Sequence, residues 1–350
     1  MTYTVGVVGT GTDPEDPDMS GFAMAYRHAG AYERLENCEL VACADVVPEN
    51  AAAFAREHGL DDEHVYEDHA AMLAGEDPDV VSVTVPPAVH ADIVVDCAHA
   101  GVDAVHCEKP MALTWGGARL MAREAHRRGT RLTFNHQRRF GGEYREAKRL
   151  LDDGAVGDLE RVETAPPNLY DWGTHAFDLC NYYNDETPPE WVLANLDYRE
   201  EDVWFGAHNE NQAVAQWQYA NGVDGLATTG FGSDATGALV RLVGTDGVVE
   251  VPPDDGPDLR IRRDGAWETV ETADTDHIPL AIADVVRALD EGGESELCAR
   301  NALNATEIIF AAWESARRRG RVDLPLRIED NPLEAMVESG DLTPEPADEG

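Results

Sequence analysis

Lysine is nearly absent from this chain of 350 residues. Lys109 and Lys148 are two of its 27 basic residues, and the other 25 are arginines. An ammonium group is compact and its pKa can be shifted, whereas a guanidinium stays charged, so a retained lysine points to chemistry that arginine cannot do. Lys148 lies in the polar run Glu146-Ala147-Lys148-Arg149 and is interpreted as a surface charge. Lys109 becomes a candidate active-site residue.

The sequence also lacks cysteine pairs, long apolar runs and a secretion signal. Its six cysteines are scattered and form no CxxC pair, which predicts a reduced, cytoplasmic setting and no metal site. There is no run of about 18 apolar residues, so no transmembrane helix is expected. The first residues have no basic stretch and no cleavage site, and they are interpreted as a strand rather than a signal peptide.

Basic charge is scarce. The chain carries 68 acidic residues against 27 basic ones, for a formal charge of −41. Such a chain should repel nucleic acid and anionic membranes, which leaves small molecules as the expected partners. The acids are spread along the chain, and at about 1 M salt the Debye length of roughly 3 Å removes most of their repulsion. The composition therefore predicts a halophilic, haloarchaeal-like protein; an acidic partner-binding face is the alternative.

The first 135 residues alternate between strands and helices. Apolar runs expected to be strands occupy 3–9, 39–44, 80–85, 103–107 and 131–135, with helical patterns over 22–35, 48–58, 90–100 and 114–128. This alternation predicts an α/β domain with a parallel sheet, whose ligands bind at the carboxyl ends of the strands. Those ends carry Gly9, Asp45, Pro86-Pro87, the tripeptide Glu108-Lys109-Pro110 and Asn135-His136.

The pattern changes after residue 140. Short strands separated by turns are expected over 191–198, 212–219, 224–231, 238–243, 247–251 and 259–263, and helices over 142–152, 279–291 and 299–319. The sequence thus predicts a nucleotide-binding domain at 1–135, an α+β substrate and oligomerisation domain at 136–330 with a large, mostly antiparallel sheet, and an acidic peripheral tail at 331–350.

A candidate dinucleotide loop, Gly9-Thr10-Gly11, follows the first strand. Glycine there lets the backbone approach a pyrophosphate at a helix N-terminus. The third glycine of the usual pattern is displaced by the acidic insertion 12–20, so either Gly21 or Ala25 fills its role. Asp45 ends the second strand and could accept hydrogen bonds from a ribose, or be a surface residue. No arginine follows it to hold a 2′-phosphate, so NAD is favoured over NADP.

Asp171 and His175 form a second constellation. Placed four residues apart in the first turn of a helix, they would share one face. A carboxylate beside an imidazole fixes its tautomer and stabilises its protonated form, which suits a general base. A helix cap next to a packed histidine is the alternative.

Together these residues resemble the glucose-fructose oxidoreductase/inositol dehydrogenase (Gfo/Idh/MocA) family over residues 3–327. The resemblance rests on Gly9-Thr10-Gly11, Arg27-His28-Ala29-Gly30, Ala44-Asp45, Pro86-Pro87 with His90, Glu108-Lys109-Pro110, Asp171 with His175, and Pro325. It implies a Rossmann domain, hydride exchange between NAD(P) and a sugar or cyclitol hydroxyl, and homodimers or homotetramers formed through the second domain's open sheet.

The resemblance also implies residue roles. Lys109 would orient the reacting oxygen, His175 would take its proton and Asp171 would hold His175. Thr84, Pro86, His90 and Glu108 would join Gly9, Gly11, Gly21 and Asp45 around the cofactor. Candidate substrate contacts are Arg138, Arg139, Asn168, Tyr170 and Trp172, although the two arginines could instead make salt bridges between domains. A non-catalytic dinucleotide-binding regulator and NAD-assisted glycoside cleavage are the alternative functions.

Overall fold

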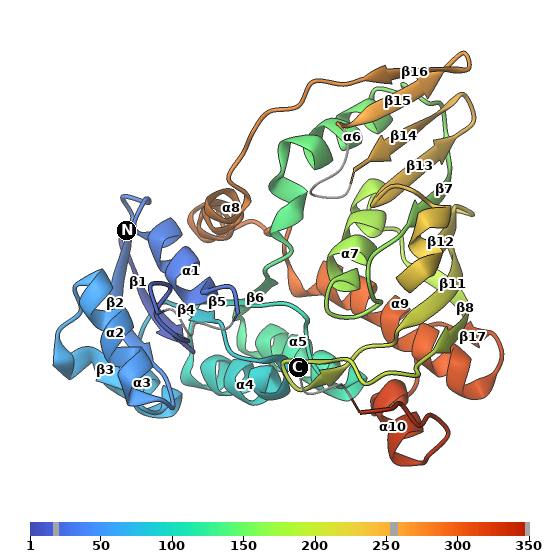
Figure 1. Cartoon of the computed structure of the whole chain (residues 1–350). Coiled ribbons are helices and arrows are strands. Elements are labelled where there is room, and N and C mark those ends of the chain that lie inside the picture. Colours follow the sequence, from blue (N-terminus) through green and yellow to red (C-terminus); the bar gives the residue numbers. More distant parts are fainter. Residues whose placement is uncertain (17–20, 253–257, 347–350) are drawn as a thin grey trace. The chain divides into compact units, whose positions relative to one another are not determined.

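The computed structural model describes residues 1–16, 21–252 and 258–346. The chain divides into two compact units (Figure 1). The first unit comprises 1–112, 117–137 and 276–302, and the second comprises 113–116, 138–275 and 303–350. Residues 276–302, which the sequence placed in the second domain, therefore belong to the first unit.

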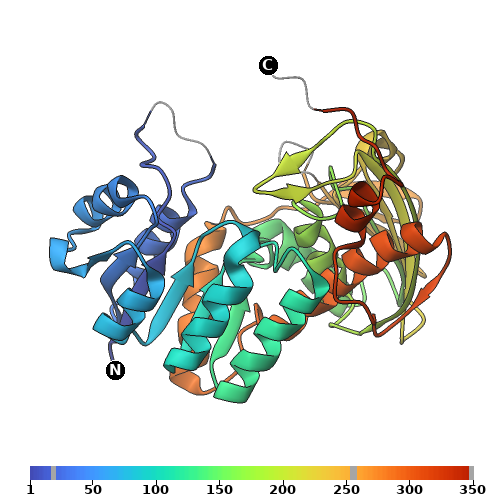
Figure 2. The same ribbon diagram turned by 90° about the horizontal axis from the view of Figure 1, so that it is seen from below.

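The first unit is built on a six-stranded parallel sheet in the order β3-β2-β1-β4-β5-β6. This is the strand order of doubly wound dinucleotide-binding folds. Helices α4 and α5 lie side by side against it (Figure 2). The strands are β1 (Tyr3–Val8), β2 (Cys38–Ala44), β3 (Val65–Tyr66), β4 (Val80–Val83), β5 (Ala104–Cys107) and β6 (Arg131–Phe134). The helices are α1 (Met24–Tyr32), α2 (Pro48–His58), α3 (His69–Glu76), α4 (His90–Ala100), α5 (Trp115–Arg128) and α8 (His277–Glu291).

Helix α8 returns to the first unit because its apolar face completes that unit's core. Ile278, Ile282 and Val286 recur every four residues and are buried. They form one cluster with residues of β1 and the end of α1, including Tyr3 and Tyr32. The periodicity of this helix was readable in the sequence, but the sheet against which it packs was not.

The second unit carries a nine-stranded sheet in the order β16-β15-β14-β13-β7-β12-β11-β8-β17. All neighbours are antiparallel except β7 and β12, which confirms the expected mostly antiparallel sheet. Helices α6 and α7 pack against strands of this sheet. The strands are β7 (Leu159–Thr164), β8 (Pro189–Asp197), β11 (Gln212–Tyr219), β12 (Asp224–Thr228), β13 (Val240–Gly244), β14 (Gly247–Val251), β15 (Arg260–Arg263), β16 (Ala266–Thr269) and β17 (Val322–Asp323). A separate hairpin pairs β9 (Val203–Trp204) with β10 (Ala207–His208). The helices are α6 (Gly142–Asp152), α7 (Gly173–Tyr183), α9 (Ala299–Arg318) and α10 (Pro332–Glu338).

The C-terminal segment is better packed than its acidic composition predicted. Asn331 caps α10 by accepting hydrogen bonds from Leu333 N and Glu334 N, and Leu333 and Met336 are buried. Further on, Glu345 pairs through its backbone with Arg199 and Glu201. The expectation of a peripheral tail is therefore wrong for residues 331–336, whose apolar side chains are mostly buried, whereas residues 338–346 are mostly exposed; residues 347–350 lie outside the described part of the chain.

Candidate active site

The glycine loop follows β1 and touches the ends of two neighbouring strands. Gly9 has φ +86°, and a Cβ placed there would lie 2.3 Å from Cγ1 of Val85. Its N–H donates to the carbonyl of Ala44, at 2.8 Å. Gly11 has φ +64°, and no atom outside its immediate neighbours lies within 4 Å of its Cβ position. Gly9 thus permits close strand packing, whereas Gly11 leaves the backbone open toward a ligand.

Ala25, and not Gly21, fills the packing role of the third glycine. Gly21 is exposed and precedes α1, and no atom lies within 4 Å of its Cβ position. Ala25 is 1% exposed and packs in a cluster with Val7 of β1. A small residue at this point lets the helix approach the strand. The packing role therefore belongs to Ala25, while contact between Gly21 and the cofactor stays a prediction; residues 17–20 of the insertion lie outside the described residues.

Asp45 joins the end of β2 to the glycine loop. Its Oδ2 accepts hydrogen bonds from Thr10 Oγ1 at 3.1 Å and Gly11 N at 3.0 Å, and its Oδ1 accepts from Val47 N at 2.9 Å. The carboxylate is half-buried. It is therefore placed beside the dinucleotide loop, where a ribose-binding acid is required. This carboxylate and the open backbone at Gly11 fit an NAD adenosine.

The loop after β4 is hydrogen-bonded to the glycine loop and, through His90, is joined to the loop after β5. Thr84 Oγ1 donates to the carbonyl of Gly9 at 2.7 Å, and Pro86 is exposed. His90 is fully buried, with Nε2 2.8 Å from the carbonyl oxygen of Val85 and Nδ1 3.1 Å from that of Pro110. His90 thus ties the loop after β4 to the loop after β5, while Thr84 and Pro86 lie at the sheet edge itself.

A buried polar network surrounds Glu108, which is 7% exposed. Its Oε1 accepts from Asn135 Nδ2 at 2.7 Å and lies 3.0 Å from His28 Nε2, while Oε2 accepts from Lys109 N at 3.1 Å. The other ring nitrogen of His28 meets Ser82 Oγ at 2.7 Å. Burial alone would raise the pKa of Glu108, but the hydrogen bonds from His28 and Asn135 outweigh it and hold that pKa at about 2. The carboxylate therefore anchors the turn that carries Lys109.

Lys109 follows this anchor directly. It is half-buried and is joined to Pro110 by a cis peptide bond. Its position beyond β5, next to β4 in the sheet, places it on the same edge as Gly9, Asp45 and Thr84. The first unit thus gathers the predicted lysine and the predicted cofactor residues at the carboxyl ends of its strands.

In the second unit, Asp171 and His175 lie at the start of α7. The helix begins at Gly173, so Asp171 lies in the preceding turn and not in the first helical turn as expected. Asp171 is half-buried and His175 is 5% exposed. The amide of Asp171 donates to Asn209 Oδ1 at 3.2 Å, and that of Trp172 donates to Asn168 Oδ1 at 2.9 Å. The ring of Trp172 meets that of His175 edge-on, with centroids 6.2 Å apart.

The candidate substrate contacts have different surroundings. The guanidinium of Arg138 lies 4.0 Å from the ring centroid of Trp172 and donates to Tyr144 OH at 2.7 Å. Tyr170 is 1% exposed and packs between Phe310 and Trp313, so its ring belongs to the core and its assignment to the substrate is corrected. Arg139 is buried, binds Asp178 through two nitrogens at 2.6 and 2.7 Å, and pairs with Glu186. Both of these carboxylates lie within the second unit.

Two models of one oxidoreductase family match the chain. Residues 4–136 match its NAD-binding Rossmann domain, and residues 160–324 match its C-terminal α/β domain. The chain belongs to this Gfo/Idh/MocA family of oxidoreductases. It is thereby an NAD-dependent enzyme, as the strand order and the glycine loop predicted.

Known members of the family match most of the chain. D-apiose dehydrogenase of Paraburkholderia graminis is 26% identical over 89% of this chain and 90% of its own length. Inositol 2-dehydrogenase of Rhizobium meliloti is 30% identical over 54% of this chain and 57% of its own. The crystal structure of aldose-aldose oxidoreductase from Caulobacter crescentus superposes with a TM-score of 0.76 at 21% identity, covering 93% of this chain and all of the other. That structure shares the fold.

Sequence reasoning missed buried residues whose hydrogen bonds support the segments that carry the candidate catalytic side chains. His28 appeared only as part of a motif and Asn135 only as a residue at a strand end, and Asn209 and Glu210 were not singled out. All four are at most 1% exposed. A polar side chain inside or next to an apolar run was the available signal, because such a group is buried only when it is hydrogen-bonded.

Among the described residues, no helix is long and apolar enough to span a membrane.

Proposed function

We propose that this enzyme transfers a hydride between NAD and a hydroxyl-bearing carbon of a sugar, sugar derivative or cyclitol. The observation that carries the proposal is Lys109, fixed by the Glu108 network on the strand edge that also presents the cofactor residues. The substrate classes of the named relatives, apiose and inositol, support the same chemistry. NAD, when bound, supplies the hydride acceptor for alcohol oxidation.

Lys109 and His175 have complementary roles in this proposal. Oxidation of an alcohol releases a proton together with the hydride, so a base that accepts the proton and a cation that stabilises the developing alkoxide both lower the barrier. His175 accepts the hydroxyl proton, and Asp171 orients its ring. Lys109 polarises the reacting oxygen. Gly11, Asp45, Thr84 and Pro86 hold the cofactor.

Arg138, Asn168 and Trp172 are proposed to contact the substrate. The stacked Arg138 guanidinium and Trp172 ring combine hydrogen-bond donors with an aromatic face. Such a surface suits a polyol, which offers hydroxyls on its rim and C–H groups on its faces.

The two lysines allow a matched test. We expect Lys109→Ala to lower kcat/KM by about 10²-fold or more, because one electrostatic stabiliser of the transition state is lost. Lys148→Ala removes an ion pair with Asp152 and Asp185 and should retain wild-type turnover. The assay is NADH absorbance with aldoses, uronates, inositols and glycosides at about 2 M KCl, where charge repulsion is screened.

Two other outcomes of this assay would replace the proposal. NADH binding without turnover of any substrate would favour a non-catalytic regulator. Glycoside cleavage without net NADH would favour transient oxidation of the sugar. Lys109→Ala with full turnover would reject the role of Lys109.

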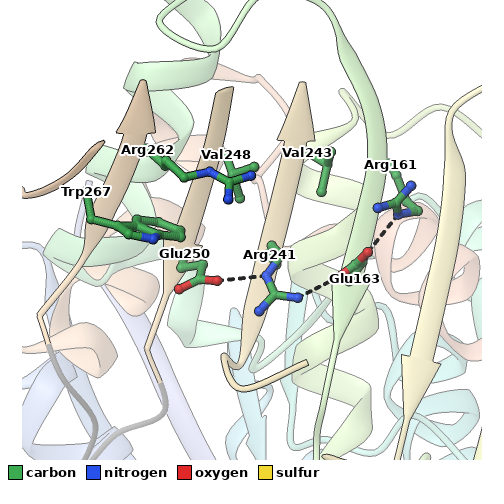
Figure 3. Close-up of a pocket in the computed structure, with 8 residues that line it drawn as sticks. All are labelled: Arg161, Glu163, Arg241, Val243, Val248, Glu250, Arg262 and Trp267. Atoms are coloured by element: carbon green, nitrogen blue, oxygen red, sulfur yellow. Dashed lines mark hydrogen bonds and ion pairs between the residues drawn. The ribbon is translucent and has the colours of Figure 1, made fainter. Parts of the chain in front are cut away.

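We also propose that the uncovered face of the second unit's sheet joins copies of this chain. On that face Arg241 lies between Glu163 and Glu250, at 3.0 and 2.8 Å (Figure 3). Farther along the sheet the same face exposes Leu193 and Val214, at 45% and 47%. Large apolar side chains on adjacent strands mark an interaction surface. The double variant Leu193→Glu/Val214→Glu should be a monomer by light scattering. The control, Leu280→Glu at an exposed position of α8, should keep the mass of the wild type. An unchanged mass for the double variant would contradict the interface.

Salt adaptation and a cytoplasmic setting are the remaining proposals. The net charge of −41 supports the first, and six cysteines free of disulfides support the second. Thermal unfolding should shift to higher temperature between about 0.1 and 2 M KCl as repulsion is screened. A melting temperature independent of KCl over that range rules out the salt adaptation.

A further inference from the structure

The segment 167–172, which carries Asp171 to the start of α7, belongs to neither a helix nor a strand. Its backbone amides therefore need partners outside regular secondary structure. The amide of Leu169 donates to Glu210 Oε1 at 2.7 Å, and the amide of Asp171 donates to Asn209 Oδ1 at 3.2 Å. Two consecutive side chains thus accept from alternate amides of this segment.

Both accepting side chains are themselves fixed. Asn209 is fully buried, its N–H donates to the carbonyl of Asp202 at 2.8 Å, and its Nδ2 donates to that of Ala207 at 3.3 Å. Glu210 is 1% exposed, and its carboxylate also accepts from Trp313 Nε1 at 3.1 Å and Thr229 Oγ1 at 3.3 Å. The amides of the segment are therefore attached to rigid neighbours.

A carboxylate at position 210 is costly for stability. Burial raises the pKa of Glu210 to about 7, which reflects the free energy needed to keep a charge away from water. Well-packed apolar residues often replace buried charged groups without loss of stability. Here, however, the Leu169 amide, the Trp313 indole N–H and the Thr229 hydroxyl all need an acceptor, and the carboxylate of Glu210 serves all three.

We propose that Asn209 and Glu210 are positioning residues for the dehydrogenase reaction, which set the place of Asp171 and the start of α7 through the 167–172 segment. The inference rests on the proposed roles of Asp171 and His175. A misplacement of about 1 Å at a reacting group can lower turnover by about 10²-fold. Loss of the hydrogen bonds from the 167–172 segment to Asn209 and Glu210 should therefore lower kcat more than it changes KM.

Asn211 provides a matched control. It lies two residues from Asn209 and makes the same kind of contact, with Oδ1 accepting from Arg199 N at 2.7 Å and Glu200 N at 2.9 Å. Its hydrogen bonds go to the segment before the β9–β10 hairpin, and among the described residues its side chain makes none to 167–172. Removal of either side chain costs backbone hydrogen bonds, but only Asn209 contacts the Asp171 turn.

The test compares Asn209→Ala, Asn209→Asp and Asn211→Ala. We expect Asn209→Ala to lower kcat by about 10- to 100-fold with KM changed less than about 3-fold. Asn209→Asp keeps an oxygen at the same place and, protonated in this buried site, should recover most of the turnover. Asn211→Ala should keep kcat within about 2-fold. Equal kcat in the two alanine variants would overturn the proposal.

Hydrogen exchange separates this inference from the proposed function. Without any substrate, amides of 168–172 should exchange faster in Asn209→Ala and Glu210→Ala, but not in Asn211→Ala. Unchanged exchange at these amides overturns the positioning role even in an active enzyme. If the wild type oxidises none of the assayed substrates, the proposed function fails. The exchange data still decide whether Asn209 and Glu210 hold the 167–172 segment.

Discussion

Each unit contains a buried glutamate that accepts a hydrogen bond from a backbone amide at or near a candidate catalytic residue. Glu108 binds the amide of Lys109, and Glu210 binds that of Leu169, two residues before Asp171. They differ in charge state. The pKa of Glu108 is held at about 2, whereas that of Glu210 is raised to about 7.

The partners explain this difference. Burial raises both pKa values, but Glu108 is opposed by a histidine, an amide side chain and the nearby Lys109 cation. Glu210 receives its hydrogen bonds from an indole, a hydroxyl and backbone amides, all of them neutral. Similar burial thus produces an anchor that stays ionised down to low pH in one unit and one that titrates near neutrality in the other.

Removal of Glu108 should have the largest effect. Glu108→Ala leaves His28, Asn135 and the Lys109 amide without their shared acceptor, and should lower the free energy of unfolding by about 3–5 kcal/mol. Urea denaturation at high KCl measures it. Glu268→Ala, which breaks an exposed ion pair with Arg263, should cost less than about 1 kcal/mol. Equal costs for the two variants would mean that the Glu108 network does not stabilise the fold.

Removal of Glu210 should have a smaller effect. Glu210→Ala deprives Leu169 N and Trp313 Nε1 of their acceptor, which costs about 1–3 kcal/mol, but it also removes an acid that is expensive to ionise. The same urea titration at pH 7 should therefore rank this variant between Glu108→Ala and Glu268→Ala. A loss as large as that of Glu108→Ala would show that the donors around Glu210 stabilise the fold as strongly as the Glu108 network does.

The pH dependence of stability should have opposite signs at the two sites. The folded pKa of Glu108 is below the ordinary 4.5, so its stabilisation is present above about 4.5 and is lost as pH falls toward 2. The folded pKa of Glu210 is above 4.5, so its contribution is most favourable below about 4.5 and is lost as pH rises toward 7. Unfolding free energies of the wild type, Glu108→Gln and Glu210→Gln across pH 2–8 test this. Parallel curves for wild type and Glu210→Gln between 4.5 and 7 would contradict it.

Trp313→Phe should have the smallest effect. It removes one N–H donor from Glu210 and keeps an aromatic ring beside Tyr170. With one donor fewer, the pKa of Glu210 should rise further, so the pH range of its titration moves upward by less than about one unit. The pH dependence of unfolding of this variant relative to Glu210→Gln measures the shift. A downward shift would mean that the indole does not stabilise the ionised carboxylate.

Much of the site was predictable because it follows strands. Gly9, Asp45, Thr84 and Lys109 each lie at or close to the end of an apolar run, and parallel strands bring their carboxyl ends to one edge. The corrections concern residues whose role depends on packing. Gly21 and Ala25 had equal claims until α1 packed Ala25 against Val7. Tyr170 was predicted to contact substrate because aromatic faces suit polyols, but it is buried against Phe310 and Trp313.

Strand β7 was missed for a related reason. Its sequence, Leu-Glu-Arg-Val-Glu-Thr, is too charged to be recognised as a central strand. Arg241 from the neighbouring β13 pairs with Glu163 and offsets the cost of burying that carboxylate. Only the assembled sheet supplies this partner, since the two residues are far apart in the chain.

The sequence by itself determined the parallel and antiparallel sheets, the family, the acidic surface and Lys109, because these depend on local periodicity, composition and the ends of strands. Tertiary structure alone decided which unit α8 completes, which small residue meets β1 and which side chains hold Lys109 and Asp171. The bonds of Glu108 to Asn135 and His28 span 27 and 80 positions, and those of Asn209 to Asp171 and of Glu210 to Trp313 span 38 and 103. Hydrogen bonds over such separations leave no periodic pattern in the sequence, so they emerge only when the sheets form.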